Sequence, residues 1–175
     1  GFPGERTGFL PHHDGWSDFE HATLAFGYGL NVTTLQLAQA YAILAADGIS
    51  RPITLFRRDR VPEGERVFAA ETAKSVRLML EAVVSQEGTA RRAAIPGYRV
   101  AGKTGTAKKA TPQGYVDGKY QSVFVGMAPV SQPRFVMVVM IDEPGGKDYY
   151  GGLVAAPTFA NVMPAALRLY SIPPD

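Results

Sequence analysis

The sequence predicts an α+β fold in which helices pack on an antiparallel sheet. Two segments with a helical apolar period come first, three strand-like segments follow, and a last helical segment ends the chain. Helices and strands therefore do not alternate, as they would in a doubly wound parallel sheet. The chain has 175 residues, of which 46% are apolar, and this is enough for one domain with a hydrophobic core.

The first half of the chain is predicted to hold two helices. Thr33 and Gln36 match a capping box, so the first helix should begin after Thr33 and end at Gly48. Apolar side chains lie almost all round this segment, which predicts a buried and central helix. A single apolar stripe predicts the second helix, over about residues 70–86.

The segments before and between these helices are predicted to be irregular. Residues 1–30 are rich in Gly, Pro, His and aromatic residues without a sustained period, which is typical of ordered loop with short turns. Residues 49–69 are expected to contain only one short extended piece, at 53–56.

The second half of the chain changes to a strand period. Strands are predicted over residues 98–107, 121–128 and 134–141. A short turn with a proline joins the last two, so they should form an antiparallel hairpin. Pro and Gly residues predict a loop over 108–119 and a second, Gly-rich loop over 142–152. A final helix is predicted from about Pro157, with Pro164 as a kink or a break.

Composition excludes several classes of function. Charged residues make up 19% of the chain, the net charge is +2, and no dense run of Lys and Arg indicates a nucleic-acid surface. Cysteine is absent, which excludes disulfides and thiolate metal sites. The longest apolar run, Phe135–Ile141, is far too short to cross a bilayer. Because the chain begins in mid-pattern without a methionine, we expect it to be a piece of a longer protein.

One motif predicts a nucleotide-binding domain. Residues 97–104 match the pattern G-x-x-x-x-G-K-[ST], and Asp142 ends an apolar strand, as a magnesium-binding Asp does in P-loop enzymes. In a P-loop, however, the lysine opens a helix whose amides hold the phosphates. Here Gly105 and Thr106 come directly after Lys103-Thr104, and no helical apolar stripe occurs between 105 and 120. The context therefore disfavours a P-loop, which remains the rival hypothesis.

The same lysine belongs to Lys103-Thr104-Gly105-Thr106, which lies within a predicted strand. Its residue types suit an enzyme that binds a peptide ending in a carboxylate. The ammonium supplies a positive field, two hydroxyls can donate hydrogen bonds to the anion, and the glycine leaves room for a peptide along the strand edge. The backbone N–H of Thr106 is a candidate oxyanion donor. A period of two places Thr104 and Thr106 on one face and Lys103 on the other, so the lysine must reach the site around the strand edge or from behind it.

Several motifs together resemble the class B penicillin-binding proteins, over the whole chain. The resemblance is carried by Phe26-Gly27-Tyr28-Gly29, Gly88-Thr89-Ala90, Ala101–Ala107, Phe124–Pro129, Tyr149-Tyr150-Gly151-Gly152 and Ala156–Phe159. K-T-G is part of the signature that these proteins share with serine β-lactamases. The resemblance is greatest to the division-septum transpeptidases of Gram-negative bacteria. It implies that residues 1–175 are the C-terminal part of one transpeptidase domain with a penicillin-binding protein and serine β-lactamase-like fold.

The resemblance also implies a function. Such enzymes cross-link peptidoglycan stem peptides that end in D-Ala-D-Ala, are acylated by β-lactams, and use no cofactor. Lys103 would be catalytic, and Thr104, Gly105 and Thr106 would bind the substrate. Further substrate contacts would come from Lys108 and from an aromatic wall of Tyr120, Tyr149 and Tyr150. Division proteins would be partners, and an N-terminal helix outside this chain would anchor the protein at the periplasmic face of the inner membrane.

The chain departs from the family pattern in one respect. The family requires Ser-x-x-Lys for its nucleophile and base, and Ser-x-Asn on a second wall of the cleft. None of the serines at positions 17, 50, 75, 85, 122, 131 and 171 is followed by Lys at the third position or by Asn at the second. In the family both motifs lie before the segment that begins at Gly1. We therefore expect the chain alone to be inactive and to need the missing N-terminal half of the domain as a partner.

Two other hypotheses were considered. A non-catalytic, partner-binding module of the division machinery would also fit a chain without the nucleophile. A metal site is not predicted, although Asp14 follows His12 and His13, because adjacent histidines should point in divergent directions and no pair has helical spacing.

Overall fold

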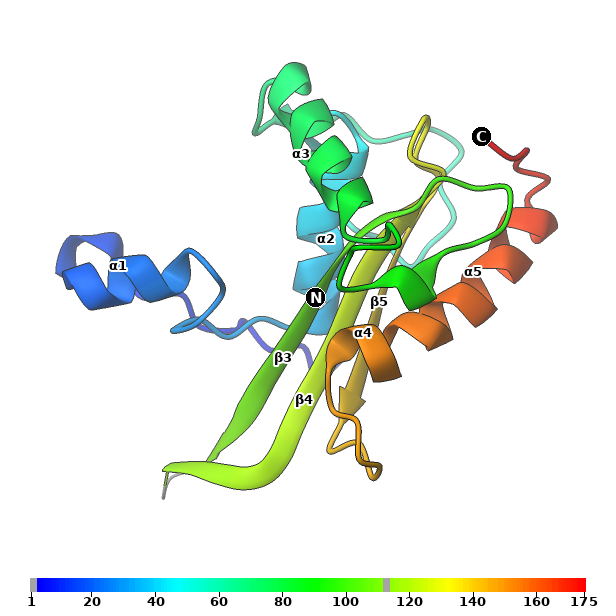
Figure 1. The fold of residues 1–175 in the computed structure, drawn as a ribbon. Coiled ribbons are helices and arrows are strands. Elements are labelled where there is room, and N and C mark those ends of the chain that lie inside the picture. Colours follow the sequence, from blue (N-terminus) through cyan, green and yellow to red (C-terminus); the bar gives the residue numbers. More distant parts are fainter. Residues whose placement is uncertain (1–2, 112–113) are drawn as a thin grey trace.

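A three-stranded antiparallel sheet forms the centre of the molecule, in a computed structural model that describes residues 3–111 and 114–175. The strands are β3 (Ala101–Thr111), β4 (Gly114–Ala128) and β5 (Phe135–Asp142), in the order β3-β4-β5. In the register, Lys103 lies opposite Val125, and Val125 lies opposite Val138. Figure 1 shows the three strands side by side. The predicted α+β class and the β4–β5 hairpin are confirmed.

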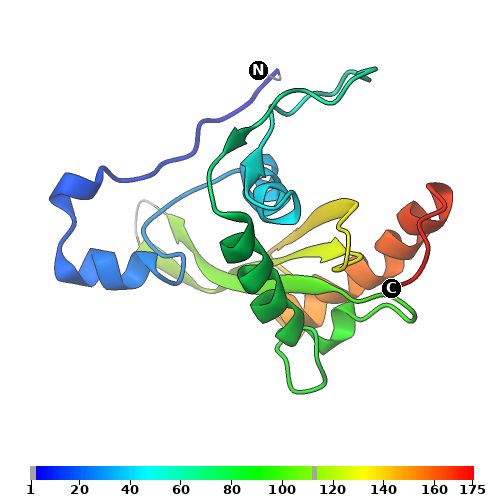
Figure 2. The same ribbon diagram turned by 90° about the horizontal axis from the view of Figure 1, so that it is seen from above.

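Helices cover both faces of this sheet (Figure 2). On one face α5 (Ala156–Leu169) packs Phe159 edge-on against Phe124, with ring centroids 5.1 Å apart, and Met163 and Leu167 complete this cluster. On the other face α2 (Thr34–Ala45) and α3 (Ala70–Ala82) bury Leu80 against Met127. The strand period of two therefore supplies two apolar faces, one for each helical layer.

The hairpin of β3 and β4 is longer than predicted. Lys108 pairs with Tyr120 and Thr111 pairs with Gly114, so most of the predicted loop at 108–119 is paired strand with an irregularity after Lys108. The prediction was wrong because Gly118 adopts a φ of 77° without ending the strand. Pro112 lies outside the described residues. The hairpin extends well beyond the helices as a two-stranded arm (Figure 1).

The helix α2 begins as predicted but is not buried. Thr33 accepts a hydrogen bond from the Gln36 backbone, and the Gln36 side chain accepts one from Thr33 N, which confirms the capping box. No residue of α2 is fully buried, because only one side of the helix contacts the sheet. A cavity of about 400 Å³ lies between α2 and the start of β5, lined by Ala38, Ala42 and Phe135 among others.

The segments predicted to be irregular contain short elements. A 3-10 turn, η1 (His13–Gly15), and a helix, α1 (Asp18–Leu24), lie within residues 1–30 and stand apart from the sheet (Figure 1). The extended piece expected at 53–56 is absent from the described chain; the two-residue strands β1 (Ile49–Ser50) and β2 (Glu65–Arg66) pair instead.

Two features near the C-terminus refine the predictions. A four-residue helix, α4 (Gly151–Val154), begins at the end of the predicted Gly-rich loop. Pro164 lies inside α5 without ending it. No helix in the described parts of the chain combines the length and the apolar character that crossing a membrane requires.

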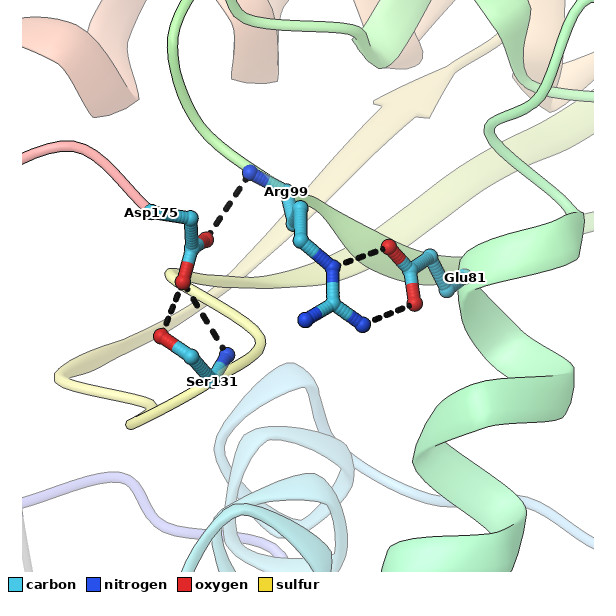
Figure 3. A network of polar contacts seen from close by, with 4 residues as sticks. All are labelled: Glu81, Arg99, Ser131 and Asp175. Carbon is cyan, nitrogen blue, oxygen red and sulfur yellow. Dashed lines mark hydrogen bonds and ion pairs between the residues drawn. The ribbon is translucent and has the colours of Figure 1, made fainter.

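A polar network fixes the start of β3 (Figure 3). The Arg99 guanidinium donates two hydrogen bonds of 2.7 Å to the Glu81 carboxylate on α3. Asp175 accepts a 2.9 Å bond from Arg99 N, a 3.3 Å bond from Ser131 N and a further bond from the Ser131 hydroxyl. Helix α3, the entry to β3, the β4–β5 connection and Asp175 are thereby held together.

A buried arginine ties α3 to the end of α2. Arg77 Nη1 donates a 2.6 Å hydrogen bond to Leu44 O and lies 2.7 Å from Asp47 Oδ1. The Arg77 side chain is 8% exposed, whereas that of Asp47 is 59% exposed. Since the last carbonyl groups of a helix have no partner within it, Arg77 supplies one at the C-terminus of α2.

We predict that Arg77→Met lowers the free energy of unfolding by about 2–3 kcal/mol, because a charged donor to the end of α2 is lost. Urea denaturation measures the change. Asp47→Asn is the matched control: its carboxylate is largely exposed, and Asn accepts the φ of 53° found there, so the loss should stay below about 1 kcal/mol. Equal losses in both variants would contradict a dominant role for the hydrogen bond to Leu44.

Candidate active site

Strand β3 presents its lysine and its threonines on opposite faces. Ala101 packs with Leu80 on the face covered by α2 and α3, and Lys103, two residues on, lies on the same face and is exposed. On the other face, Thr106 Oγ1 accepts a 3.1 Å hydrogen bond from Gly151 N of α4. Lys103 Nζ donates a 2.9 Å bond to Thr104 O, so the ammonium turns back onto the backbone of its own strand.

Three threonine hydroxyls gather at one pocket on the α4 side. The pocket has a volume of about 310 Å³ and is lined by Thr89, Thr104, Thr106, Tyr150, Gly151, Gly152 and Leu153. Thr89 Oγ1 lies 3.2 Å from Thr104 Oγ1, within hydrogen-bonding distance. The sequence motif around Thr89 indicated the family but no role for this residue; only the folded chain brings it beside Thr104.

The glycines around this pocket differ in whether a side chain would fit at their positions. A Cβ at Gly151 would lie 2.2 Å from Val123 O and 2.6 Å from Gly105 O, and one at Gly152 would lie 2.0 Å from Thr89 O. Helix α4 therefore sits directly on the sheet, and neither position has space for a side chain. At Gly105 the nearest atom to an added Cβ is Val123 Cβ, at an ordinary 3.6 Å. Packing within the chain does not require glycine at 105.

The three predicted tyrosines form one stack beside the pocket. Tyr120 and Tyr149 are nearly parallel, with centroids 4.0 Å apart and an interplanar angle of 11°. Tyr149 and Tyr150 follow at 4.5 Å, and their hydroxyls lie 3.2 Å apart. This hydrogen bond raises the pKa of Tyr150 above its usual value. The buried Ser122 hydroxyl donates to Tyr149 O and so fixes the stack to β4.

Lys108 lies farther along β3, at the base of the arm. Its ammonium is 2.9 Å from Asp117 Oδ1, and this hydrogen bond is the main reason that the pKa of Lys108 is raised. Lys108 lines a second pocket of about 330 Å³, together with Tyr28 and Asn31 from the N-terminal segment. The structure thus brings Thr104, Thr106 and Tyr150 to one pocket and places Lys108 at another.

A charged cluster holds the loop that carries Tyr149 and Tyr150. Lys109 Nζ lies 2.9 Å from Asp142 Oδ2 and 2.7 Å from Glu143 Oε1, and hydrogen bonds from Lys109 lower the pKa of both carboxyls. Glu143 N donates a 2.9 Å bond to Tyr120 O. Asp142 is thus part of a structural cluster at the end of β5.

The rival P-loop hypothesis fails on geometry. Lys103 lies inside strand β3, which continues to Thr111, so this lysine does not open a helix as the lysine of a P-loop does. Asp142 is paired with Lys109.

Comparison with known proteins gives the family. A model of the penicillin binding protein transpeptidase domain matches residues 1–164. Over 175 residues the chain is 48% identical to the probable peptidoglycan D,D-transpeptidase PbpC of Pseudomonas aeruginosa and 48% identical to the peptidoglycan D,D-transpeptidase FtsI of Escherichia coli K12. Both alignments include the whole of this chain but only 31% and 30% of the two relatives, so the chain spans less than a third of their length.

The fold agrees with this result. The apo structure of the TP domain from Burkholderia pseudomallei penicillin-binding protein 3 superposes with a TM-score of 0.93 at 46% identity, over 100% of this chain and 54% of that one. The family model, the sequence identity to these relatives and the shared fold lead to one conclusion. The chain belongs to the transpeptidase domain family of the class B penicillin-binding proteins.

Proposed function

We propose that residues 1–175 are the C-terminal part of a single transpeptidase domain and supply one wall of a peptidoglycan D,D-transpeptidase active site. The observation that carries the proposal is the gathering of Thr89, Thr104 and Thr106 around one pocket on the strand that bears Lys103. The family and the names of its relatives support a D,D-transpeptidation of peptidoglycan, and action on stem peptides during septal wall synthesis belongs to the same proposal.

The hydroxyls suit a carboxylate. In this proposal the donor stem peptide lies along the outer edge of β3, which has no neighbouring strand in the described chain, with its terminal carboxylate between Thr104 and Thr106. Thr89 orients the Thr104 hydroxyl through their 3.2 Å contact. Gly105 keeps the strand edge free of a side chain, and Thr106 N–H is the candidate donor to the oxyanion.

The reaction is an acyl transfer. A serine hydroxyl attacks the carbonyl of the penultimate D-Ala, and the oxyanion intermediate collapses with loss of the terminal D-Ala, whose amine takes a proton. The acyl group then passes to an amine of a neighbouring stem and frees the serine. The serine and its lysine base would come from the segment before Gly1. Lys103 would supply positive charge to the carboxylate and to the hydroxyls that relay protons.

The remaining predicted residues lie around this centre. We assign the stack of Tyr120, Tyr149 and Tyr150 to the wall against which the stem peptide or the β-lactam packs, since Tyr150 lines the pocket. Lys108 lies beside the second pocket and would contact a more distant part of the substrate.

The N-terminal half of the domain is the first partner that the proposal requires. The open side of α2 and the cavity between α2 and β5 support this, because both leave apolar surface that a single domain would cover. Localisation at the periplasmic face of the inner membrane, by an anchor outside this chain, and contact with division proteins belong to the same proposal.

The central test is covalent labelling by a fluorescent penicillin. The 175-residue polypeptide should remain unlabelled because it lacks Ser-x-x-Lys, and a protein that also carries the upstream segment should label. In that longer protein, Lys103→Met should lower the acylation rate by about 10²–10³-fold, since one preorganised positive group is lost. Labelling of the 175-residue polypeptide, or full-rate labelling of the lysine variant, would overturn the proposal.

The carboxylate site makes a separate prediction. Thr106→Val in the longer protein should lower the acylation rate for a carboxylate ligand by roughly tenfold to a hundredfold, because one hydrogen bond to a charged group is lost. A ligand with a carboxamide in place of the carboxylate should acylate both the parent and the Thr106→Val variant slowly. Its acylation rate should therefore differ little between the two proteins. Thr111→Val, on the distant arm, is the matched control. Equal losses for both ligands would argue against carboxylate binding.

A substitution at Gly105 should affect ligand binding but not folding. Gly105→Ala should leave the free energy of unfolding within about 0.5 kcal/mol of the parent, because its Cβ meets only an ordinary contact. Acylation should nonetheless slow by about tenfold or more, since the methyl group displaces the peptide from the strand edge. Thermal unfolding and labelling kinetics measure the two effects, and an unchanged labelling rate would remove Gly105 from the site.

A further inference from the structure

A cluster of His12, His13 and Asp14 lies on the N-terminal segment, outside the wall just described. The sequence predicted no metal site there, because adjacent histidines should diverge. In the 3-10 turn η1 they do not: the two imidazole rings are stacked, with centroids 4.7 Å apart and an interplanar angle of 29°. The premise of that prediction was therefore wrong.

The donor atoms of the cluster have the spacing of a coordination shell. His12 Nδ1 lies 3.3 Å from Asp14 Oδ2, His13 Nε2 lies 3.0 Å from Asp14 Oδ1, and the potential ligand atoms all lie within 4.8 Å of one another. A tetrahedral zinc ion with bonds of about 2.0–2.2 Å separates its ligands by about 3.3–3.6 Å. Both His–Asp distances are thus close to such a separation, and Asp14 offers a different oxygen to each imidazole.

The cluster is open to solvent and its backbone is braced. The three side chains are 73–77% exposed, so a cation can enter and keep water on its free positions. Trp16 Nε1 donates a 3.2 Å hydrogen bond to Pro11 O, and the Ser17–Glu20 capping box fixes the start of α1 directly after the turn. His21, the third histidine, stacks on Trp16 instead.

Ion pairing alone is a weak reason for this arrangement. Exposed ion pairs contribute little to stability, so pairing with Asp14 does little to hold two imidazole rings against each other. A divalent cation bound by both imidazoles and the carboxylate would hold all three groups together.

We propose that His12, His13 and Asp14 form a site for a divalent transition metal, with Zn²⁺ as the first choice. Two imidazoles and one carboxylate suit zinc and its neighbours, whereas Ca²⁺ and Mg²⁺ require oxygen ligands. Three protein ligands leave at least one position for water or for a group from another molecule. The proposal is independent of the transpeptidase function.

The test is a Zn²⁺ titration of the full chain followed by NMR of the imidazole ring protons. The chain has three histidines, so each can be assigned. We expect the His12 and His13 signals to move together and to saturate at one equivalent, with His21 unaffected, and excess Mg²⁺ to leave them in place. Equal shifts of all three histidines, or shifts that do not saturate, would overturn the proposal.

A matched pair of variants gives a second measurement. His13→Gln should weaken Zn²⁺ binding, measured by competition with a chromophoric chelator, by about tenfold or more, because one of three coordinating groups is lost. His21→Gln removes a histidine of the same segment but outside the cluster and should bind as the parent does. Circular dichroism confirms that both variants keep the fold, and equal affinities for all three proteins would refute the site.

Discussion

At the start of α4, Gly151 lies against the backbone of β3 and β4 and Gly152 lies against the carbonyl of Thr89, so closely that neither position has room for a side chain. This packing positions the rest of the candidate site. It brings Gly151 N to the Thr106 hydroxyl and Gly152 beside Thr89, and it places Tyr150 at the pocket. With a bulkier residue at either glycine, α4 would move outward and the pocket would lose one of its walls.

The second constraint is the pleat of β3. Because successive side chains alternate, the ammonium of Lys103 and the hydroxyls of Thr104 and Thr106 cannot share a face. In the structure the ammonium of Lys103 instead returns to the backbone carbonyl of Thr104, which lies between the two faces of the strand. An edge strand is the place where this is possible, since its outer side is not filled by another strand.

Much of the fold could be predicted from local signals. The capping box at Thr33 and Gln36 and the apolar periods of α3, β4 and β5 lie within single segments, and the structure confirms them. Ser17 and Glu20 form a second capping box, which is also present in the sequence but lies among many residues that favour loops. The length of the β3–β4 hairpin exceeds the prediction because glycine favours a loop at position 118, whereas pairing across the strands tolerates it.

The features of the structure that the sequence did not predict depend on contacts between segments or on the conformation of a turn. The residue types and order of Lys103 to Thr106 were enough to predict a strand and which of its side chains share a face. Nothing local places Thr89 beside Thr104, since fifteen positions and the entry to β3 separate them. The orientation of His12 and His13 depends on a single 3-10 turn, which residue spacing alone does not reveal.

The glycines also differ in what natural selection acts on. At Gly102, Gly151 and Gly152 an added Cβ would lie less than 3.0 Å from another atom of the chain, so folding alone selects against a side chain there. At Gly105 folding imposes no such constraint, because an added Cβ meets only an ordinary contact. If the proposed role of Gly105 holds, only ligand binding selects for glycine at this position, and a mutation there alters binding without a loss of folded protein.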